Sequence, residues 1–193
     1  MKAPTLAGER ILLRPVLPAD RDARQRFGFH TDIERGYGVL RESGPMTDDE
    51  ADRWHERLVH EEDDPSRMAW AIEAAGDLAG LAFLQRIREV DAKAQFAIGL
   101  LSPELFGHGY GTGATHLVLA HAFGQMALHR VDLRVLAFNE RAIAMYRRCG
   151  FVEEGVERDS CRMGGQWYDD VIMGILTHEF GDGRSSASGG VHT

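Results

Sequence analysis

Apolar residues along this chain fall into short runs separated by turn-forming residues, a pattern typical of a protein rich in β-strands. Residues 130–136 show it most regularly, because Val131, Leu133 and Val135 alternate with polar positions as in a half-buried strand. Two further runs flank the turn residues 75–77, as in a β-hairpin. The strands predicted in this way are residues 10–14, 68–74, 78–87, 92–101, 130–136, 151–163 and 166–177.

Helical spacing and helix-end signals predict helices between these strands. Thr47 and Glu50 fit a capping box, in which a hydroxyl and a carboxylate satisfy free N–H groups of the first turn. Asn139 is a suitable N-cap and Gly150 a suitable stop for a helix with one apolar face. The predicted helices are residues 20–29, 47–60, an apolar helix within 105–129, and 139–149, whereas 30–44 is predicted to be irregular.

The order of these elements indicates the fold class. Antiparallel strands come first, and a strand–helix–strand–helix–strand order follows. We therefore expect one α/β (α+β) domain with a mixed, mostly antiparallel central sheet flanked by helices. This domain is predicted to cover residues 1–180, and the Gly/Ser-rich residues 181–193 are predicted to be a disordered tail.

Charge and cysteine content narrow the class of protein. The chain has 22 Lys and Arg against 30 Asp and Glu, a net charge of −8 that argues against a general nucleic-acid binder. Cys149 and Cys161 match no disulfide framework and no metal-ligand spacing, so we expect a cytoplasmic protein without a metal. Residues 105–129 lack Asp, Glu, Lys and Arg, but their glycines and histidines argue against a membrane span.

Acidic residues are concentrated in one segment. Nine fall between Asp48 and Asp64, against Arg53 and Arg57. The simpler interpretation is a solvated helix face with its exit loop. The alternative is a surface that attracts a cationic substrate.

The strongest candidate for a binding site is the glycine-rich segment 106–114, between a predicted strand and an apolar helix. Its four alternate glycines let the backbone bend sharply and approach a ligand closely. Free N–H groups and the positive end of the following helix would together cradle an anion such as a phosphate. Glycine clusters also occur in plain turns, so phosphate binding and a structural turn both remain open at this point.

Two known phosphate-binding patterns fit this segment poorly. No Gly-Lys-Ser/Thr closes it, which excludes a P-loop. Gly109, Gly111 and Ala114 match a dinucleotide fingerprint, and Asp132 follows at a suitable distance. However, Asp132 lies near the start of its strand, and several antiparallel strands precede the segment. A nicotinamide-dependent oxidoreductase is therefore a distant alternative.

A second segment, residues 139–151, combines helix signals with candidate chemistry. Ala142, Ile143, Tyr146 and Cys149 share one helix face. On its own Tyr146 is explained as a half-buried core residue, and the role of catalytic proton donor is the alternative.

The two segments together, with one strand between them, resemble the GCN5-related N-acetyltransferases, the GNAT family. The resemblance rests on residues 98–103 leading into 106–114, then on Asn139, Ala142, Tyr146, Gly150 and Phe151. Residues 9–15 and 168–173 are most similar to the branch that contains the ribosomal-protein N-terminal and spermidine acetyltransferases. The match covers about residues 8–178 and implies a GNAT-like domain with acetyl-CoA as co-substrate.

The resemblance also implies the roles of individual residues. The backbone of Leu100 and Leu101 would pair with pantetheine, and N–H groups of 107–111 with Thr112 and Gly113 would hold the pyrophosphate. Tyr146 would protonate the departing thiolate, and Asn139 would bond the pantetheine or acetyl region as the second catalytic residue. The implied acetyl-CoA contacts are Leu100, Leu101, Phe106, Gly107, His108, Gly109, Tyr110, Gly111, Thr112, Gly113, Asn139, Ala142 and Tyr146.

Two positions depart from the family pattern. Phe106 stands where Arg or Gln is usual, and His108 where a basic residue is frequent. Each change removes positive charge near the phosphates, which either weakens CoA binding or is compensated by Arg141 or Arg147.

The resemblance is less informative about the acceptor. Glu73 and Glu89 are candidate general bases, and His30 and Tyr37 candidate contacts in the loop that shapes the acceptor pocket in related enzymes. We expect direct acetyl transfer to a primary amine, with a protein or peptide N-terminus as the leading acceptor and a polyamine or aminoglycoside as the alternative. A non-catalytic acyl-CoA-binding module is the rival class. We expect no nucleic-acid or membrane partner, and a homodimer is an open prediction.

Overall fold

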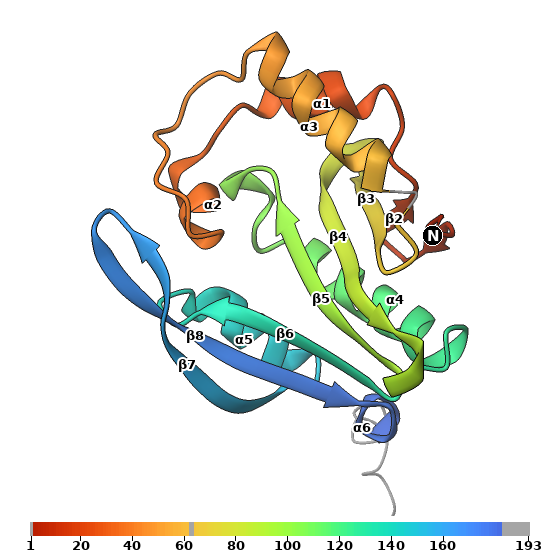
Figure 1. Ribbon diagram of the computed structural model, residues 1–193. Coiled ribbons are helices and arrows are strands. Elements are labelled where there is room, and N and C mark those ends of the chain that lie inside the picture. Colours follow the sequence, from red (N-terminus) through yellow and green to blue (C-terminus); the bar gives the residue numbers. More distant parts are fainter. Residues whose placement is uncertain (1, 62–63, 183–193) are drawn as a thin grey trace, which may run out of the picture.

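One eight-stranded sheet organises the computed structural model, which describes residues 2–61 and 64–182 (Figure 1). The strand order is β1-β2-β3-β4-β5-β6-β8-β7, and every neighbouring pair is antiparallel except β5 and β6. The strands are β1 Leu6–Ala7, β2 Ile11–Arg14, β3 Met68–Ala74, β4 Asp77–Arg88, β5 Lys93–Leu100, β6 Arg130–Leu136, β7 Val152–Met163 and β8 Gln166–Leu176. This arrangement confirms the predicted α/β (α+β) fold with a mixed, mostly antiparallel sheet.

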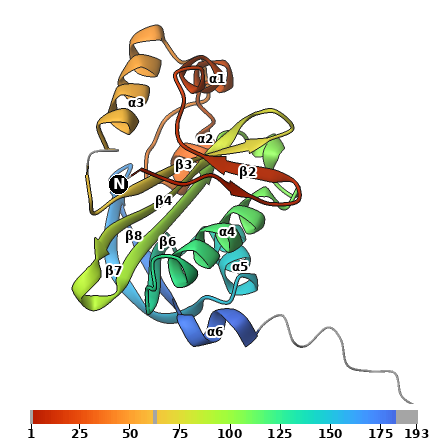
Figure 2. The same ribbon diagram turned by 90° about the vertical axis from the view of Figure 1, so that its right-hand side faces the viewer.

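The helices cover both faces of this sheet. Figure 2 shows α4 and α5 together against one face, apart from α1 and α3. The helices are α1 Asp20–Phe27, α2 Thr31–Gly36, α3 Asp48–Glu61, α4 Tyr110–Gly124, α5 Glu140–Arg148 and α6 Thr177–Asp182, with the short 3-10 turns η1 Glu89–Asp91 and η2 Pro103–Leu105.

Two apolar cores follow from the alternation of side chains along the central strands. Trp70 and Ile72 of β3 point into the larger core with α4 and α5, whereas Ala71 points into the smaller core with α1 and α3. On β5, Phe96 belongs to the larger core. The sheet is thus buried on both faces, which explains why its central strands read as nearly continuous apolar runs.

The capping box predicted for α3 is present. Thr47 N–H donates to the Glu50 carboxylate at 3.0 Å, and the Glu50 N–H donates to the Thr47 hydroxyl at 3.3 Å. Arg21 of α1 donates to Asp48 at 3.0 Å and to Asp52 at 2.7 Å. Part of the acidic segment therefore holds α1 and α3 together, in agreement with a helix-face interpretation.

The sheet splits between β5 and β6. These parallel strands pair only from Lys93–Gln95 to Arg130–Asp132, although β5 continues to Leu100 and β6 to Leu136. Beyond the paired segment β6 keeps only β8 as a neighbour, and β5 keeps only β4. The diverging ends, visible in Figure 1, leave one edge of β5 without a partner strand.

The irregular segment predicted at residues 30–44 contains a helix, so that prediction is wrong for α2. The helix has six residues and no buried one, and therefore gives no apolar periodicity. Contacts distant in sequence fix it, because Phe29 and Gly44 exchange backbone hydrogen bonds of 2.7 and 3.0 Å. The Thr31 N–H also donates to the Ser43 hydroxyl at 2.9 Å.

Residues 181–193 are predicted to be a disordered tail, but residues 181 and 182 belong to helix α6. The remaining part of the predicted tail, residues 183–193, lies outside the described residues. In the described ranges no helix is long and apolar enough to cross a membrane.

A buried histidine in α4 makes stability depend on pH. His121 is 9% exposed and packs edge-on against Trp70, and within residues 2–61 and 64–182 its Nε2 has no hydrogen-bond partner. Burial lowers the pKa of His121, and the hydrogen bond to Gln125 opposes this shift without cancelling it. The unfolded chain therefore takes up a proton near its ordinary pKa of 6.5, before the folded chain does.

We expect the free energy of unfolding to fall as pH drops below about 6.5, by at most about 1.4 kcal/mol per pH unit from this residue. Urea unfolding between pH 5 and 8 measures this slope. His121→Gln should flatten it, whereas His178→Gln, which changes an exposed histidine of α6, should not. Equal slopes in all three proteins would contradict the assignment.

Candidate active site

A cavity of about 650 Å3 occupies the split between β5 and β6. Its walls come from the end of β5, from the loop and first turn of α4, from α5, and from α2. Three types of surface thereby meet in one place: an open strand edge, a helix N-terminus and polar side chains.

The glycine-rich segment opens α4 and faces this cavity. Gly107 has φ +79° and Gly109, the N-cap of α4, has φ +81°, backbone conformations that favour glycine. A Cβ atom at Gly107, Gly109 or Gly111 would meet no atom within 4 Å. The first intrahelical bond runs from the Gly113 N–H to the Gly109 carbonyl, so the preceding N–H groups lack helical partners. This geometry suits an anion.

The free edge of β5 is the second surface. Leu101 donates its N–H to the Ala79 carbonyl at 2.9 Å, so this group is already bonded to the β4 side. In antiparallel pairing, successive residues direct their backbone groups to opposite neighbours. The N–H and C=O groups of Leu100 and Ile98 therefore point to the side from which β6 has diverged. Leu100 and Ile98 line the cavity, whereas Leu101 does not.

The two polar atoms of the Asn139 side-chain amide have different surroundings. Its Oδ1 accepts a hydrogen bond from the Ala142 N–H at 3.2 Å, as the predicted N-cap of α5. Its amide nitrogen lies beside Gly36 of α2, where a Cβ would approach to 3.4 Å. Asn139 lines the cavity, so one half of the amide supports α5 while the other half is available to a ligand.

The capping role of Oδ1 predicts how two substitutions of Asn139 affect stability, and the second substitution is the control for the first. Asn139→Ala should lower the free energy of unfolding by about 1 kcal/mol, because the cap of α5 is lost. Asn139→Asp keeps an oxygen acceptor and should remain within about 0.5 kcal/mol of the original chain. Chemical unfolding measures both. Equal destabilisation by the two substitutions would contradict a capping role for Oδ1.

Tyr146 reaches the cavity from α5. It is 6% exposed, and its ring packs edge-on against Phe96 and Phe151. The residue lines the cavity, and in the part of the chain that the structure describes its hydroxyl has no hydrogen-bond partner. Burial raises the pKa of Tyr146, and Tyr37 and Cys149 raise it further. Tyr146 is therefore a neutral hydroxyl that can donate a proton at a fixed position.

The family model described as an acetyltransferase (GNAT) domain matches residues 10–152, most of the chain. The chain belongs to the GNAT acetyltransferase family. The resemblance inferred from the two segments is thus confirmed, and with it acetyl-CoA as the co-substrate of the class.

Two GNAT relatives from different bacteria are named for different acceptors. Spermidine N(1)-acetyltransferase of Escherichia coli (strain K12) is 34% identical over 126 residues, 65% of this chain and 66% of that enzyme, just under two thirds of its length. YdaF of Bacillus subtilis, provisionally named a ribosomal N-acetyltransferase, is 31% identical over 105 residues, 54% of this chain and 57% of YdaF.

A solved GNAT structure supports the fold over nearly the whole chain. Spermidine N-acetyltransferase from Vibrio cholerae, crystallised in complex with CoA and spermine, superposes with a TM-score of 0.74 at 25% identity. The superposition covers 90% of this chain and 99% of that enzyme. The predicted GNAT-like arrangement of sheet and helices is therefore confirmed.

The two departures from the GNAT pattern have different surroundings. The Arg141 guanidinium lies over the Phe106 ring, 3.4 Å from its centroid, and both residues line the cavity beside the glycine loop. Among the described residues Arg141 has no carboxylate partner. Arg147, the other candidate for compensation, instead pairs with Glu153. Of the two candidates, Arg141 lines the cavity and Arg147 does not.

His108 does not line the cavity. Its Nε2 lies 3.2 Å from the Glu104 carbonyl, and its ring packs against Tyr110. Its own carbonyl accepts a hydrogen bond of 3.3 Å from Arg10.

Gly113 also lies outside the lining of the cavity, and a Cβ there would approach Ile11 of β2 to 3.4 Å. The structure brings together the other predicted acetyl-CoA contacts apart from Leu101, namely Leu100, Phe106, Gly107, Gly109, Tyr110, Gly111, Thr112, Asn139, Ala142 and Tyr146.

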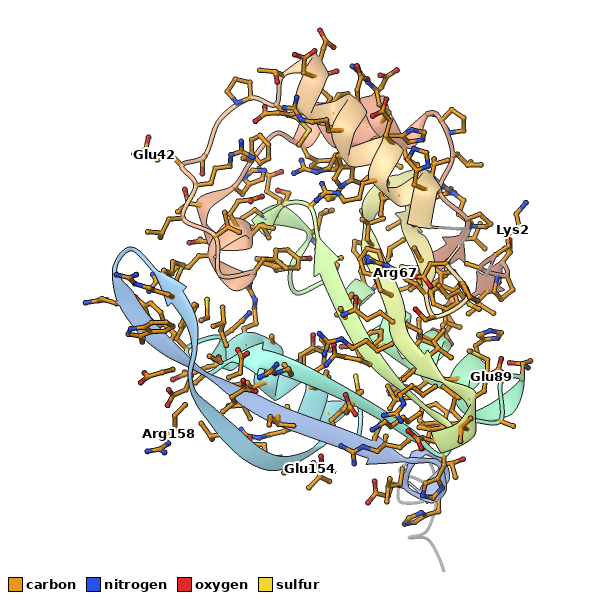
Figure 3. All side chains as sticks on the ribbon, viewed as in Figure 1. Lys2, Glu42, Arg67, Glu89, Glu154 and Arg158 are labelled. Atoms are coloured by element: carbon orange, nitrogen blue, oxygen red, sulfur yellow. The ribbon has the colours of Figure 1, made fainter. Side chains whose placement is uncertain are left out.

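The two acids suggested as general bases lie elsewhere. Glu73 pairs with Arg14 at 2.6 Å and does not line the cavity. Figure 3 shows Glu89 at the connection of β4 and β5, the end of β5 opposite to α2. His30, the N-cap of α2, is also outside the lining, whereas Tyr37 belongs to it.

Sequence reasoning missed several polar residues of this GNAT site. They come from α2, β6, α5, β7 and β8, and their only shared property is proximity to the split. They are Asp32, Arg134, Arg148, Cys161 and Asp170. Within the described ranges no group of His, Cys, Asp or Glu is arranged to hold a metal ion.

Proposed function

We propose that this GNAT chain transfers the acetyl group of acetyl-CoA to a primary amine of a small cationic molecule, with a polyamine as the leading class. The observation that carries the proposal is the convergence of three features in one cavity. They are the free edge of β5, the anion cradle at the start of α4, and the Tyr146 hydroxyl. Each suits a different part of acetyl-CoA.

Acetyl-CoA would lie along the split as a substitute for the missing neighbour of β5. Backbone groups of Ile98 and Leu100 would pair with the pantetheine amides, a form of strand addition. N–H groups from Gly107 to Thr112 would hold the pyrophosphate. The stacked Arg141 would add the positive charge that Phe106 lacks.

The reaction needs few groups from the protein. A neutral amine attacks the thioester carbonyl, so that a C–N bond forms and the C–S bond breaks. The departing thiolate takes a proton from Tyr146, which is reprotonated from water, and the new ammonium loses its proton to water. Holding the amine and the thioester together supplies much of the acceleration.

One unpaired carboxylate in the cavity suits a cationic substrate. Asp32 lines the cavity, and among the described residues it has no ion-pair partner. Asp170 also lines it, 3.7 Å from Arg134, whose guanidinium is shared with Glu157. The relatives named for spermidine support this choice over the protein N-terminus favoured by the sequence, and the ribosomal name of YdaF keeps peptides as the second candidate.

An acceptor panel tests the proposal. Thiol release from acetyl-CoA is measured with spermidine, spermine, an aminoglycoside and N-terminal peptides. We expect the highest kcat/KM for a polyamine. Asp32→Asn should raise the KM of that polyamine about 3- to 5-fold, as expected for one exposed charge pair.

Asp49→Asn is the matched control, because Asp49 lies on α3 outside the cavity. This variant should leave the KM unchanged. A peptide as the best acceptor would overturn the polyamine assignment. Tight acetyl-CoA binding without turnover on any amine would favour the non-catalytic binding module.

A further inference from the structure

Gly99 lies on the acceptor side of β5. Along this strand Phe96, Ile98 and Leu100 pack towards α4 and α5, whereas Leu101 packs towards α1 and α3. A side chain at position 99 would therefore point to the same face as Leu101. This face is the one from which α2 closes the cavity.

The Tyr37 hydroxyl occupies the place of the missing side chain. A Cβ atom at Gly99 would lie 1.3 Å from the Tyr37 hydroxyl oxygen and 2.5 Å from its Cζ. No residue with a Cβ can share this position with the tyrosine. The glycine is therefore what lets the hydroxyl rest on the backbone of β5 in the split of the sheet.

Local contacts hold Tyr37 in this orientation. It is the C-cap residue of α2, and the following Gly38 has φ +76° and packs so closely on Cys161 that a Cβ would lie 2.7 Å from Sγ. Tyr37 lines the cavity, and although the residue as a whole is 57% exposed, its hydroxyl lies against the backbone of β5 at Gly99. Desolvation and the nearby Glu34 raise the pKa of Tyr37 to about 12, so the hydroxyl stays protonated at neutral pH.

Two tyrosines thus enter one cavity from opposite faces of the sheet. Tyr146 comes from α5 and Tyr37 from α2, and the two are close enough for Tyr37 to contribute to the raised pKa of Tyr146. Neither hydroxyl has a hydrogen-bond partner among residues 2–61 and 64–182. A tyrosine hydroxyl both donates and accepts, so each offers a free site to a bound molecule.

We infer that Tyr37 is the acceptor-side counterpart of Tyr146 and that its hydroxyl oxygen accepts a hydrogen bond from the attacking amine. The inference rests on the proposed function and assigns a residue to the acceptor half of the site. A neutral primary amine has two N–H donors and one lone pair. If one N–H bonds to Tyr37 above Gly99, the lone pair is directed into the split, where the thioester carbonyl would lie.

Tyr37 neither gains nor loses a proton in this role. It fixes the direction of attack, and misdirection of reacting groups by about 1 Å can cost about 100-fold in rate. The proton of the new ammonium still leaves to water, and the thiolate is still protonated by Tyr146.

Two substitutions disturb the same hydroxyl in different ways. Tyr37→Phe removes the oxygen and leaves the ring, whereas Gly99→Ala leaves the oxygen but occupies its position. We expect each to lower kcat/KM for the amine about 10- to 100-fold. The dissociation constant of acetyl-CoA, measured by calorimetry, should stay within about twofold for Tyr37→Phe. The double variant should be no worse than Gly99→Ala, because both act on one interaction.

Matched controls are Tyr168→Phe on β8 and Gly155→Ala on β7, neither of which lines the cavity. A Cβ at Gly155 would meet nothing within 4 Å. Thermal melts establish that each variant folds. If Gly99→Ala does not fold, Tyr37→Phe alone decides.

The outcomes separate this inference from the proposed function. If the original chain acetylates an amine and Tyr37→Phe retains kcat/KM within about twofold, the inference is wrong and the proposed function stands. Additive losses in the double variant also overturn it. If the original chain acetylates no amine of the panel, the proposed function fails and the role of Tyr37 fails with it.

Discussion

Replacing Tyr146 with phenylalanine should lower kcat by about 100- to 10,000-fold, the range that one positioned proton donor contributes. The ring contacts with Phe96 and Phe151 do not involve the hydroxyl, so the variant should fold. Binding of acetyl-CoA should change by less than about twofold, because the loss concerns the departing thiolate and not the ground state. Thiol release at saturating amine, with calorimetry on acetyl-CoA, measures both quantities.

The pH profile adds a second check on Tyr146. Burial raises its pKa above the ordinary value of 10, so the proton donor remains protonated throughout the range of a normal assay. The rate of the original chain should therefore rise with pH as the acceptor amine loses its proton, without a decline up to about pH 9.5. Tyr168→Phe should behave like the original chain. A Tyr146→Phe variant with full kcat would show that the thiolate is protonated by another group or by water.

Filling the anion cradle should have the second largest effect. Gly111→Val places a side chain in the open space where the phosphates would approach the first turn of α4. Acetyl-CoA binding should weaken about 100-fold, or about 2.7 kcal/mol. The folded state should not suffer, because the space is empty and valine is a better helix residue than glycine.

Gly124→Val is the matched control for this prediction. Gly124 ends the same helix, and a Cβ there also meets nothing within 4 Å. Both variants should unfold at the same or slightly higher denaturant concentration than the original chain, and only Gly111→Val should lose acetyl-CoA. Unchanged binding by Gly111→Val would place the phosphates elsewhere.

Much of the fold could be predicted because its signals are local. The alternation in 130–136 corresponds to β6, and Asn139 caps α5 as its sequence position suggested. Helix α2 could not be predicted in this way, because six residues without a buried face carry no periodicity. Its position is set by contacts between Phe29 and Gly44.

The site was predictable where it is continuous in sequence and not where it depends on the split of the sheet. Gly107 and Gly109 were visible as a loop, and they have the positive φ values that favour glycine. The choice between Leu100 and Leu101 depends on which one bonds to Ala79, a matter of strand register. The meeting of Tyr37 with Gly99 depends on where β5 and β6 separate, which no local pattern encodes.

Product analysis shows whether the split between β5 and β6 is an acetyl-transfer site. The chain is incubated with acetyl-CoA and a polyamine, and free thiol and acetylated amine are quantified together by colour reaction and mass spectrometry. We expect the original chain to form equal amounts of both products, and Tyr146→Phe to form much less of each. Thiol release without an acetylated amine, or equal product from both proteins, would contradict it.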